Sequence, residues 1–278
     1  MNEVAVNRKR RALVFDSGIG GLTVFAPIAE TRPDLDLVYA ADDAFFPYGA
    51  LSEAALVARV GAVTAELIEK FSPDLVVIAC NTASTLVLAP LRAAYPALPF
   101  VGTVPAIKPA AEASQSRIIS VLATPGTVAR DYTRALLRDF AGDCDATLVG
   151  APKLAALAER FLRGEPVNDS DIAREIAPCF VERDGRRTDQ IVLACTHFPI
   201  LIEPLRRLAP WPVTFVDPAP AIARRVDALL GPGAMATIAS RPFPAVFTSG
   251  RPPSPKLQKA LRRLGLTATS AGERAPAV

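Results

Sequence analysis

Short runs of β-branched and other apolar residues alternate along the chain with longer stretches in which apolar residues recur every three or four positions. The short runs are typical of buried strands and the longer stretches of amphipathic helices, so the pattern predicts an α/β protein with mainly parallel sheets. We predict strands at 12–15, 36–41, 74–79, 99–102, 118–122, 145–149, 190–194, 213–216 and 244–248. We predict helices at 20–31, 52–71, 83–94, 105–114, 126–139, 153–163, 169–183, 200–208, 218–230 and 254–264.

Two segments of this pattern, 74–81 and 189–196, resemble each other. Each consists of an acidic residue, a buried strand, a cysteine and a small polar residue. In an open parallel sheet, ligands bind beyond the carboxyl ends of the strands, which is where Cys80 and Cys195 are expected. The repeat predicts two similar lobes, each a mainly parallel sheet flanked by helices, with an active site in the cleft between them.

The chain should cross between the lobes where it is rich in proline and glycine. Two such segments are 98–105 and 209–212. The sequence therefore predicts a first α/β lobe made of residues 1–102 together with 213–278, and an inserted second lobe made of residues 103–212.

Composition and charge narrow the functions to consider. Half of the 278 residues are apolar, which is enough for a large core. No apolar run approaches the length of a membrane-spanning helix, and the basic residues at 8–11 are not followed by the apolar core of a signal peptide. A net charge of +3 with both signs interleaved argues against nucleic-acid binding as the main role. Four cysteines without regular spacing predict reduced thiols and a cytoplasmic location, and the tail from 271 is expected to fray.

A glycine-rich turn at 15–22 follows the first predicted strand and opens a helix. Glycines let the backbone approach a ligand closely, and free N–H groups at a helix start favour an anion. The spacing fits neither the dinucleotide nor the P-loop pattern, so a carboxylate is a better candidate than a nucleotide. The same turn could equally be structural, with Asp16 or Ser17 capping the helix.

A second turn, Pro47-Tyr48-Gly49, follows the second predicted strand. It could offer a tyrosine hydroxyl and backbone amides to a ligand. A surface turn with a packed aromatic ring is the structural alternative.

The strand-end cysteines differ from the other two in their surroundings. Cysteine is often only a small buried apolar residue, but Cys80 and Cys195 each precede a helix, whose N-terminus stabilises a thiolate. The polar residues that follow them are poor core filler and good anion binders: Asn81, Thr82, Thr196 and His197. A thiolate can act as a base or as a nucleophile. Cys144 and Cys179 lack these neighbours and are expected to be structural, with Cys179 on a helix face.

Three mechanisms could use two thiols and the chain's single histidine, His197. Cys–His acyl transfer needs only one cysteine and leaves the other unexplained. A zinc site built from Cys80, Cys195 and His197 lacks an evident fourth ligand. Proton transfer at a carbon atom between two thiols uses both cysteines and needs neither a metal nor a cofactor. A non-catalytic, two-lobed amino-acid-binding protein is a further alternative, but it would not need both cysteines.

Five motifs occur in the order seen in glutamate racemases, which belong to the aspartate/glutamate racemase family. They lie at 16–21, 47–49, 80–84, 122–127 and 195–199, and the resemblance extends from about residue 12 to about residue 230. The sequence departs from the common pattern at Phe198, Ala151 and Asp217-Pro218.

The resemblance implies a cofactor-independent isomerase that interconverts L- and D-glutamate and supplies D-glutamate for peptidoglycan. It implies that Cys80 takes the α-proton from D-glutamate and Cys195 from L-glutamate, that Asp16 and His197 assist them, and that Glu159 is a further site carboxylate. The implied substrate-binding residues are Asp16, Ser17, Pro47, Tyr48, Gly49, Asn81, Thr82, Thr124, Thr196 and His197. A homodimer is expected by the same resemblance, and a related enzyme acting on aspartate remains the nearest alternative.

Overall fold

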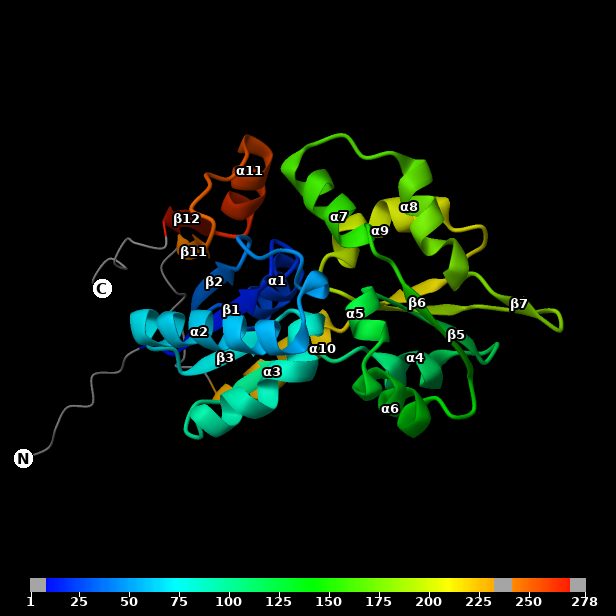
Figure 1. Cartoon of the computed structure of the whole chain (residues 1–278), viewed down its shortest axis with the longest axis horizontal. Coiled ribbons are helices and arrows are strands. Elements are labelled where there is room, and N and C mark those ends of the chain that lie inside the picture. Colours follow the sequence, from blue (N-terminus) through cyan, green and yellow to red (C-terminus); the bar gives the residue numbers. More distant parts are fainter. Residues whose placement is uncertain (1–8, 233–241, 271–278) are drawn as a thin grey trace, which may run out of the picture.

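The computed structural model describes residues 9–232 and 242–270; the predicted fraying tail from 271 and the start of the basic segment lie outside them. Within these residues, two parallel sheets flanked by helices lie side by side (Figure 1). We call the six-stranded sheet with its helices the first lobe, and the four-stranded sheet with its helices the second lobe. The predicted α/β class with two similar lobes is confirmed.

The first lobe contains both ends of the described chain. Its strands lie in the order β12-β11-β2-β1-β3-β4, and all neighbours are parallel. Its elements are β1 (Arg11–Asp16), α1 (Leu22–Thr31), β2 (Asp36–Ala41), η1 (Tyr48–Ala50), α2 (Glu53–Phe71), β3 (Leu75–Ile78), α3 (Asn81–Ala94), β4 (Phe100–Gly102), α10 (Ala219–Leu230), β11 (Phe243–Phe247), α11 (Pro255–Arg263) and β12 (Leu266–Ser270).

The second lobe is built from the middle of the chain. Its sheet has the order β10-β9-β5-β6, again with parallel neighbours. Its elements are α4 (Ile107–Ala113), β5 (Ile118–Ala123), α5 (Pro125–Val128), α6 (Asp131–Phe140), β6 (Asp145–Gly150), α7 (Leu154–Arg163), α8 (Asp169–Ile176), η2 (Ala177–Cys179), β7 (Glu182–Arg183), β8 (Arg186–Arg187), β9 (Gln190–Ala194), η3 (Phe198–Leu201), α9 (Ile202–Leu208) and β10 (Thr214–Val216).

The two sheets repeat one strand order. The run β2-β1-β3-β4 of the first lobe corresponds to β6-β5-β9-β10 of the second. The two strands that lead into cysteines, β3 and β9, therefore occupy corresponding places, each beside a central strand. In open α/β sheets this is the region, beyond the carboxyl ends of the strands, where ligands bind.

Apolar side chains cover both faces of each sheet. In the first lobe, α1, α10 and α11 pack on one face and α2 and α3 on the other. In the second lobe, α7, α8 and α9 pack on one face and α4 and α6 on the other. Strands buried on both faces are mostly apolar, and the polar side chains of the site lie at or just beyond the strand ends. No helix in the described part of the chain has both the length and the apolar character needed to cross a bilayer.

All nine predicted strands are present. Two predicted helices differ from expectation, and three further strands, β7, β8 and β12, were not predicted. The helix predicted over 169–183 stops at Ile176 because Pro178 cannot continue it, and the chain then forms the unpredicted hairpin β7–β8. Asp184 and Gly185 close that hairpin with φ values of 51° and 73°.

The helix predicted over 126–139 divides into α5 and α6. Arg130 has an extended backbone, and the carbonyl of Thr127 accepts the hydroxyl of Thr133 at 2.8 Å. The hydroxyl of Thr133 therefore supplies a hydrogen bond to a backbone carbonyl at the point where the helix would have continued.

The predicted crossing before residue 213 would assign the strand predicted at 213–216 to the first lobe. The strand instead pairs with β9, through Thr214–Gln190 and Phe215–Ile191, and so completes the second sheet. It is the counterpart of β4 in the repeated order, which is why it belongs there. The division of the chain into an outer and an inserted lobe stays a proposal, with its second crossing moved beyond β10.

Candidate active site

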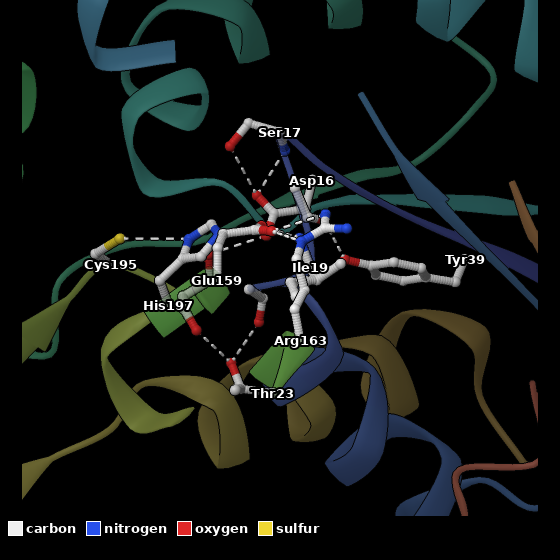
Figure 2. Close-up of polar contacts among 12 residues, drawn as sticks. Asp16, Ser17, Ile19, Thr23, Tyr39, Glu159, Arg163, Cys195 and His197 are labelled. Atoms are coloured by element: carbon white, nitrogen blue, oxygen red, sulfur yellow. Dashed lines mark hydrogen bonds and ion pairs between the residues drawn. The ribbon is translucent and has the colours of Figure 1, made fainter. Parts of the chain in front are cut away.

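Asp16 lies at the carboxyl end of β1, where the two lobes meet, and its side chain is completely buried. One carboxylate oxygen accepts the backbone N–H of Ser17 at 2.7 Å (Figure 2). The other accepts the hydroxyl of Thr196 from the second lobe at 3.0 Å. Burial raises the pKa of Asp16, although His197 and these two donors oppose the rise. The carboxyl is thus a stronger base than an exposed aspartate.

The glycine-rich turn after β1 brings the lobes into contact. A Cβ atom on Gly20 would lie 2.4 Å from Nδ1 of His197, and a Cβ on Gly18 would lie 2.4 Å from Oε1 of Glu159. Only glycine permits this approach of the backbone. The backbone N–H of Ile19 then donates to Glu159 at 2.8 Å. The groups that this turn approaches belong to the opposite lobe, whereas the sequence predicted the approach of a ligand, which stays a prediction.

A linear chain of polar groups stands behind Cys195. The thiol sulfur lies 3.8 Å from Nδ1 of His197, and Nε2 of the same ring lies 3.0 Å from Oε1 of Glu159 (Figure 2). Arg163 donates to the other oxygen of Glu159 from Nε at 3.1 Å and from Nη2 at 3.0 Å. The ring of Phe46 packs against His197 at 5.1 Å between centroids.

The charges of this chain depend on one another. Burial raises the pKa of Glu159, but the donors His197, Ile19 and Arg163 outweigh burial and leave it lowered. Burial lowers the pKa of His197, but Cys195, Glu159 and Asp16 outweigh it and leave it raised well above its ordinary value. Because the ionised carboxylate accepts from Nε2, the nitrogen facing the thiol can carry or release a proton.

Cys80 has different surroundings. It precedes α3 and is 6% exposed, and the N–H of Ala83 and the hydroxyl of Ser17 are near enough to favour its thiolate. Burial raises the pKa of the Cys80 thiol to about 12, and the nearby Asp16 and Cys195 add to the rise despite those two donors. The helix start does favour the thiolate of Cys80, through the N–H of Ala83, but burial outweighs this effect and leaves the pKa of the thiol raised.

The cysteine in the second lobe also differs from expectation in its backbone setting. Cys195 is followed by the short 3₁₀ helix η3, and the α-helix α9 begins only at Ile202. The residues between, Thr196 and His197, instead turn inward to Asp16 and Glu159.

Asn81 is the residue whose polar atoms most need a partner. It is 3% exposed, and within the described part of the chain neither its side-chain oxygen nor its side-chain nitrogen has a hydrogen-bond partner. A buried amide without partners costs about 1–3 kcal/mol, which makes Asn81 a candidate for binding a polar ligand beside Cys80. An amide can donate to a carboxylate and accept from an ammonium group.

Three threonine hydroxyls meet across the lobes next to Asn81. Thr82 lies 3.0 Å from Thr124 and 3.2 Å from Thr127, and the latter two are 3.0 Å apart. Thr82 comes from α3, whereas Thr124 and Thr127 come from the start of α5 in the second lobe. The hydroxyls can rotate their hydrogens toward an anion placed among them.

The Pro47-Tyr48-Gly49 turn lies beside this threonine cluster, and a Cβ on Gly49 would contact Thr124 at 3.9 Å. The hydroxyl of Tyr48 points away from it and donates to the buried Asp42 at 2.7 Å. Arg59 and Thr248 also donate to Asp42. The carboxylate network anchors the turn, so the turn offers its backbone and its shape more readily than the tyrosine hydroxyl.

The structure gathers all the predicted site residues around the boundary between the lobes, from Asp16, Ser17 and the 47–49 turn to 80–82, Thr124, Glu159 and 195–197. The remaining cysteines do not join them. Cys179 is buried in the core of the second lobe at the end of a 3₁₀ turn, not on an α-helix face, and Cys144 is partly exposed. The described residues contain no group of three or more His, Cys, Asp or Glu side chains that could hold a metal ion.

Three residues of this region were not predicted to take part. Arg163 lies four positions after Glu159, and that spacing on a predicted helix was the available signal. Thr127 and Asp42 are each within a few residues of a predicted site residue, but only the fold shows which way their side chains point.

A cavity of about 420 Å³ opens beside Glu159. It is lined by residues of both lobes: Asp43, Phe46, Ala156, Glu159, Arg160, Arg163, Glu165 and Arg251. Solvent can therefore approach the outer end of the chain of groups that leads to Cys195.

The fold and site define a class of α/β protein in which two similar parallel sheets present acid–base side chains to one shared, buried centre. Residues 25–226 match the model of the family described as Asp/Glu/Hydantoin racemase. The chain belongs to this family.

Its relatives include named glutamate racemases. That of Brucella canis is 59% identical over 222 residues, which cover 80% of each chain. That of Sinorhizobium fredii is 53% identical over 260 residues, which cover 93% of this chain and 97% of the relative. Among solved structures, Escherichia coli glutamate racemase in complex with L-glutamate and the activator UDP-MurNAc-ala matches with a TM-score of 0.86 and 40% identity, over 95% of this chain and 98% of that one.

Proposed function

We propose that this protein is a glutamate racemase that interconverts L- and D-glutamate by cofactor-independent proton transfer between two thiols. The observation that carries the proposal is the pairing of Cys80 and Cys195, which come from corresponding strand ends and enter one buried site. Relatives named glutamate racemase at 53–59% identity, and the 40% identical structure that holds L-glutamate, support the choice of substrate.

Each thiol would act on one face of the substrate. With D-glutamate, the Cys80 thiolate takes the α-proton and the Cys195 thiol donates its proton to the opposite face, which leaves L-glutamate and a Cys195 thiolate. With L-glutamate the roles are exchanged. The intermediate is a planar carbanion, and no electrons are gained or lost by the protein.

Asp16 and His197 would generate the two thiolates. The raised pKa of Asp16 makes its carboxylate an effective proton acceptor for the Cys80 side of the site. His197, held by Glu159, faces the Cys195 sulfur and would accept or return that proton. Binding of the substrate ammonium group near Cys80 would favour its thiolate by placing a positive charge beside it.

The substrate's polar groups would form hydrogen bonds with the polar side chains that meet between the lobes. The amide of Asn81 fits the carboxylate and ammonium groups at the α-carbon, and the hydroxyls of Thr82, Thr124 and Thr127 fit a carboxylate. Ser17, Thr196 and the backbone of the 47–49 turn complete the proposed enclosure. Donors fixed in advance around the α-carboxylate would stabilise the charge that develops on the carbanion.

The wider role follows from the reaction. We propose that the enzyme acts in the cytoplasm, where free thiols stay reduced, and that it supplies D-glutamate for peptidoglycan. All four cysteines are unpaired in the structure, which supports a reducing location. A homodimer is proposed from the family resemblance alone, and the mass of the purified protein in solution tests it.

The first experiment places the purified protein in heavy water with L-glutamate and a chelator, with no cofactor added, and follows optical rotation and α-deuteration together. Loss of rotation with deuterium entering the product is the expected result. Turnover of aspartate but not glutamate would retain the two-thiol reaction with another substrate. Binding of glutamate without exchange of its α-hydrogen would contradict the enzyme and favour a binding protein.

A further inference from the structure

We infer that Arg163 is a positioning residue for the Cys195 half of the site: it holds Glu159 against His197, and thereby fixes the imidazole behind the thiol. The inference rests on the proposed racemase function, because it concerns how one of the two proposed bases is oriented. Arg163 does not touch Cys195 or the proposed substrate region, so its effect must pass through Glu159.

The geometry around Glu159 carries the inference. Its carboxylate receives N–H donors at both oxygens: Oε1 from Ile19 and His197, and Oε2 twice from Arg163. The Glu159 side chain is 9% exposed. Removing Arg163 would leave Oε2 without its donors at the edge of the cavity, free to rotate toward solvent and away from His197.

The backbone of Arg163 is itself held by the other lobe. Arg163 is the last residue of α7, and Gly164 follows it in the left-handed conformation. The backbone carbonyl of Arg163 accepts the hydroxyl of Ser254 at 2.9 Å. Lys256 donates to the carbonyl of Phe161 at 2.9 Å. The start of α11 in the first lobe thus fixes the end of α7, so Arg163 is held through both its backbone and its side chain.

Three titratable groups face the imidazole of His197: Cys195, Glu159 and Asp16. Arg163 reaches it only through Glu159. Loss of the Arg163 charge alone would raise the pKa of His197, because a cation destabilises the imidazolium. Loss of the Glu159 contact would lower that pKa, because the imidazolium would lose its anionic partner. If Arg163 acts only through its charge, its removal raises the pKa of His197; if it acts by holding Glu159 in place, its removal lowers that pKa.

The chain offers a direct readout because His197 is its only histidine, so the imidazole gives a single, assigned set of NMR signals. For Arg163→Ala we expect a lower pKa of His197 and a kcat/KM reduced about 10- to 100-fold, as for a misplaced catalytic group. Arg163→Lys should recover part of the activity, since an ammonium group can make one of the two contacts but lacks the planar fork.

Chemical rescue provides the sharpest test. Arg163 lines the cavity of about 420 Å³, so in Arg163→Ala added guanidinium can reach the vacated place beside Glu159. Guanidinium, well below denaturing concentrations, should restore activity with saturation and raise the pKa of His197 again. Urea, which has the same shape and no charge, should not.

Arg160→Ala is the matched control. Arg160 lines the same cavity, but its contacts are to Glu165 at 3.5 Å and to the carbonyl of Pro166 at 2.6 Å. Its removal should leave both the activity and the pKa of His197 unchanged.

The inference is overturned if Arg163→Ala leaves the pKa of His197 unchanged or raised, whatever happens to activity, or if Arg160→Ala has the same effects. The NMR titration requires no turnover. A wild-type protein that fails to racemise glutamate would therefore refute the proposed function, and the titration would still decide the role of Arg163.

Discussion

The two cysteines come from corresponding places in two repeated sheets, yet they are equipped differently. Cys80 lies near a carboxyl group, Asp16, and has a thiol whose pKa is raised to about 12. Cys195 faces an imidazole that is backed in turn by Glu159 and Arg163. One side of the site holds a buried carboxyl group as its proposed proton acceptor, and the other an imidazole with an ionised carboxylate behind it.

The difference shows that a symmetric overall reaction does not require a symmetric enzyme. Enantiomers have equal free energies, so kcat/KM must be the same for both substrates in every variant that follows reversible kinetics. Unequal bases can therefore be seen only in single steps, through isotope effects, hydrogen exchange and pH profiles.

Removing either thiol should have the largest effect. Cys80→Ala and Cys195→Ala should each lower racemisation by about 10³-fold or more, since a base or an acid is missing in each direction. In heavy water, Cys80→Ala should still exchange the α-hydrogen of L-glutamate with retention, and Cys195→Ala that of D-glutamate, as NMR of the recovered substrate would show. Cys144→Ala is the control with full activity. Exchange of the opposite enantiomer by each variant would reverse the assignment of the faces.

The next largest effect should follow from replacing the partner of each thiol: Asp16→Asn and His197→Asn should each lower kcat/KM about 10²-fold. Although kcat/KM falls equally for both substrates, the slowed step differs. His197→Asn should increase the primary isotope effect with α-deuterated L-glutamate, and Asp16→Asn that with α-deuterated D-glutamate. Equal isotope effects in the two variants would argue that the bases are not divided between the lobes.

The pH profile distinguishes the two roles of Asp16. Because burial and Asp16 raise the pKa of Cys80 to about 12, kcat/KM should keep rising well above the ordinary thiol pKa of about 8.5. In Asp16→Asn the anion is gone, so the pKa of Cys80 falls and the rising limb moves to lower pH while the maximum rate decreases. A limb that stays in place would contradict the electrostatic coupling.

Asn81 should serve both faces alike. Asn81→Ala should reduce kcat/KM about 10- to 100-fold, the effect of losing a hydrogen bond to a charged group, with no change in the ratio of the two isotope effects. The free energy of unfolding of the unliganded protein should not fall, because the buried amide has no partner there to lose. Urea denaturation measures this. A clear loss of stability would show that Asn81 supports the fold instead.

The smallest effect is expected at the threonine cluster. Thr127→Val keeps the shape and removes one hydroxyl, which is worth about 0.5–1.5 kcal/mol, so KM should rise by a few-fold to tenfold with kcat nearly unchanged. Steady-state kinetics in both directions measure this. A fall in kcat with constant KM would place the hydroxyl in the transition state for proton transfer instead.

Much of this architecture could be predicted from the sequence. The strand-end positions of Asp16, Cys80 and Cys195 follow from apolar runs that end in polar residues, because strands covered on both faces are mostly apolar. The unpredicted hairpin depended on Pro178 and on the turn at Asp184-Gly185, whose local signals were outweighed by a helical pattern.

The electrostatics could not be predicted in the same way. The helix start next to Cys80 is visible in the sequence, but the depth of burial, which decides the sign of the change in its pKa, is not. The contacts of Glu159 with His197 and Ile19 join residues 38 and 140 positions apart, and only the packing of the lobes brings them together.

The repeated strand order has a geometric consequence for substrate recognition. L- and D-glutamate are mirror images, but a chain of L-amino acids cannot contain a mirror plane, so two similar units in it are related only by rotation and translation. The protein therefore cannot offer each enantiomer the reflected set of contacts. Both enantiomers must place their two carboxylates and their ammonium group in nearly the same positions, so that only the hydrogen atom and the α-carbon move when the configuration at the α-carbon inverts.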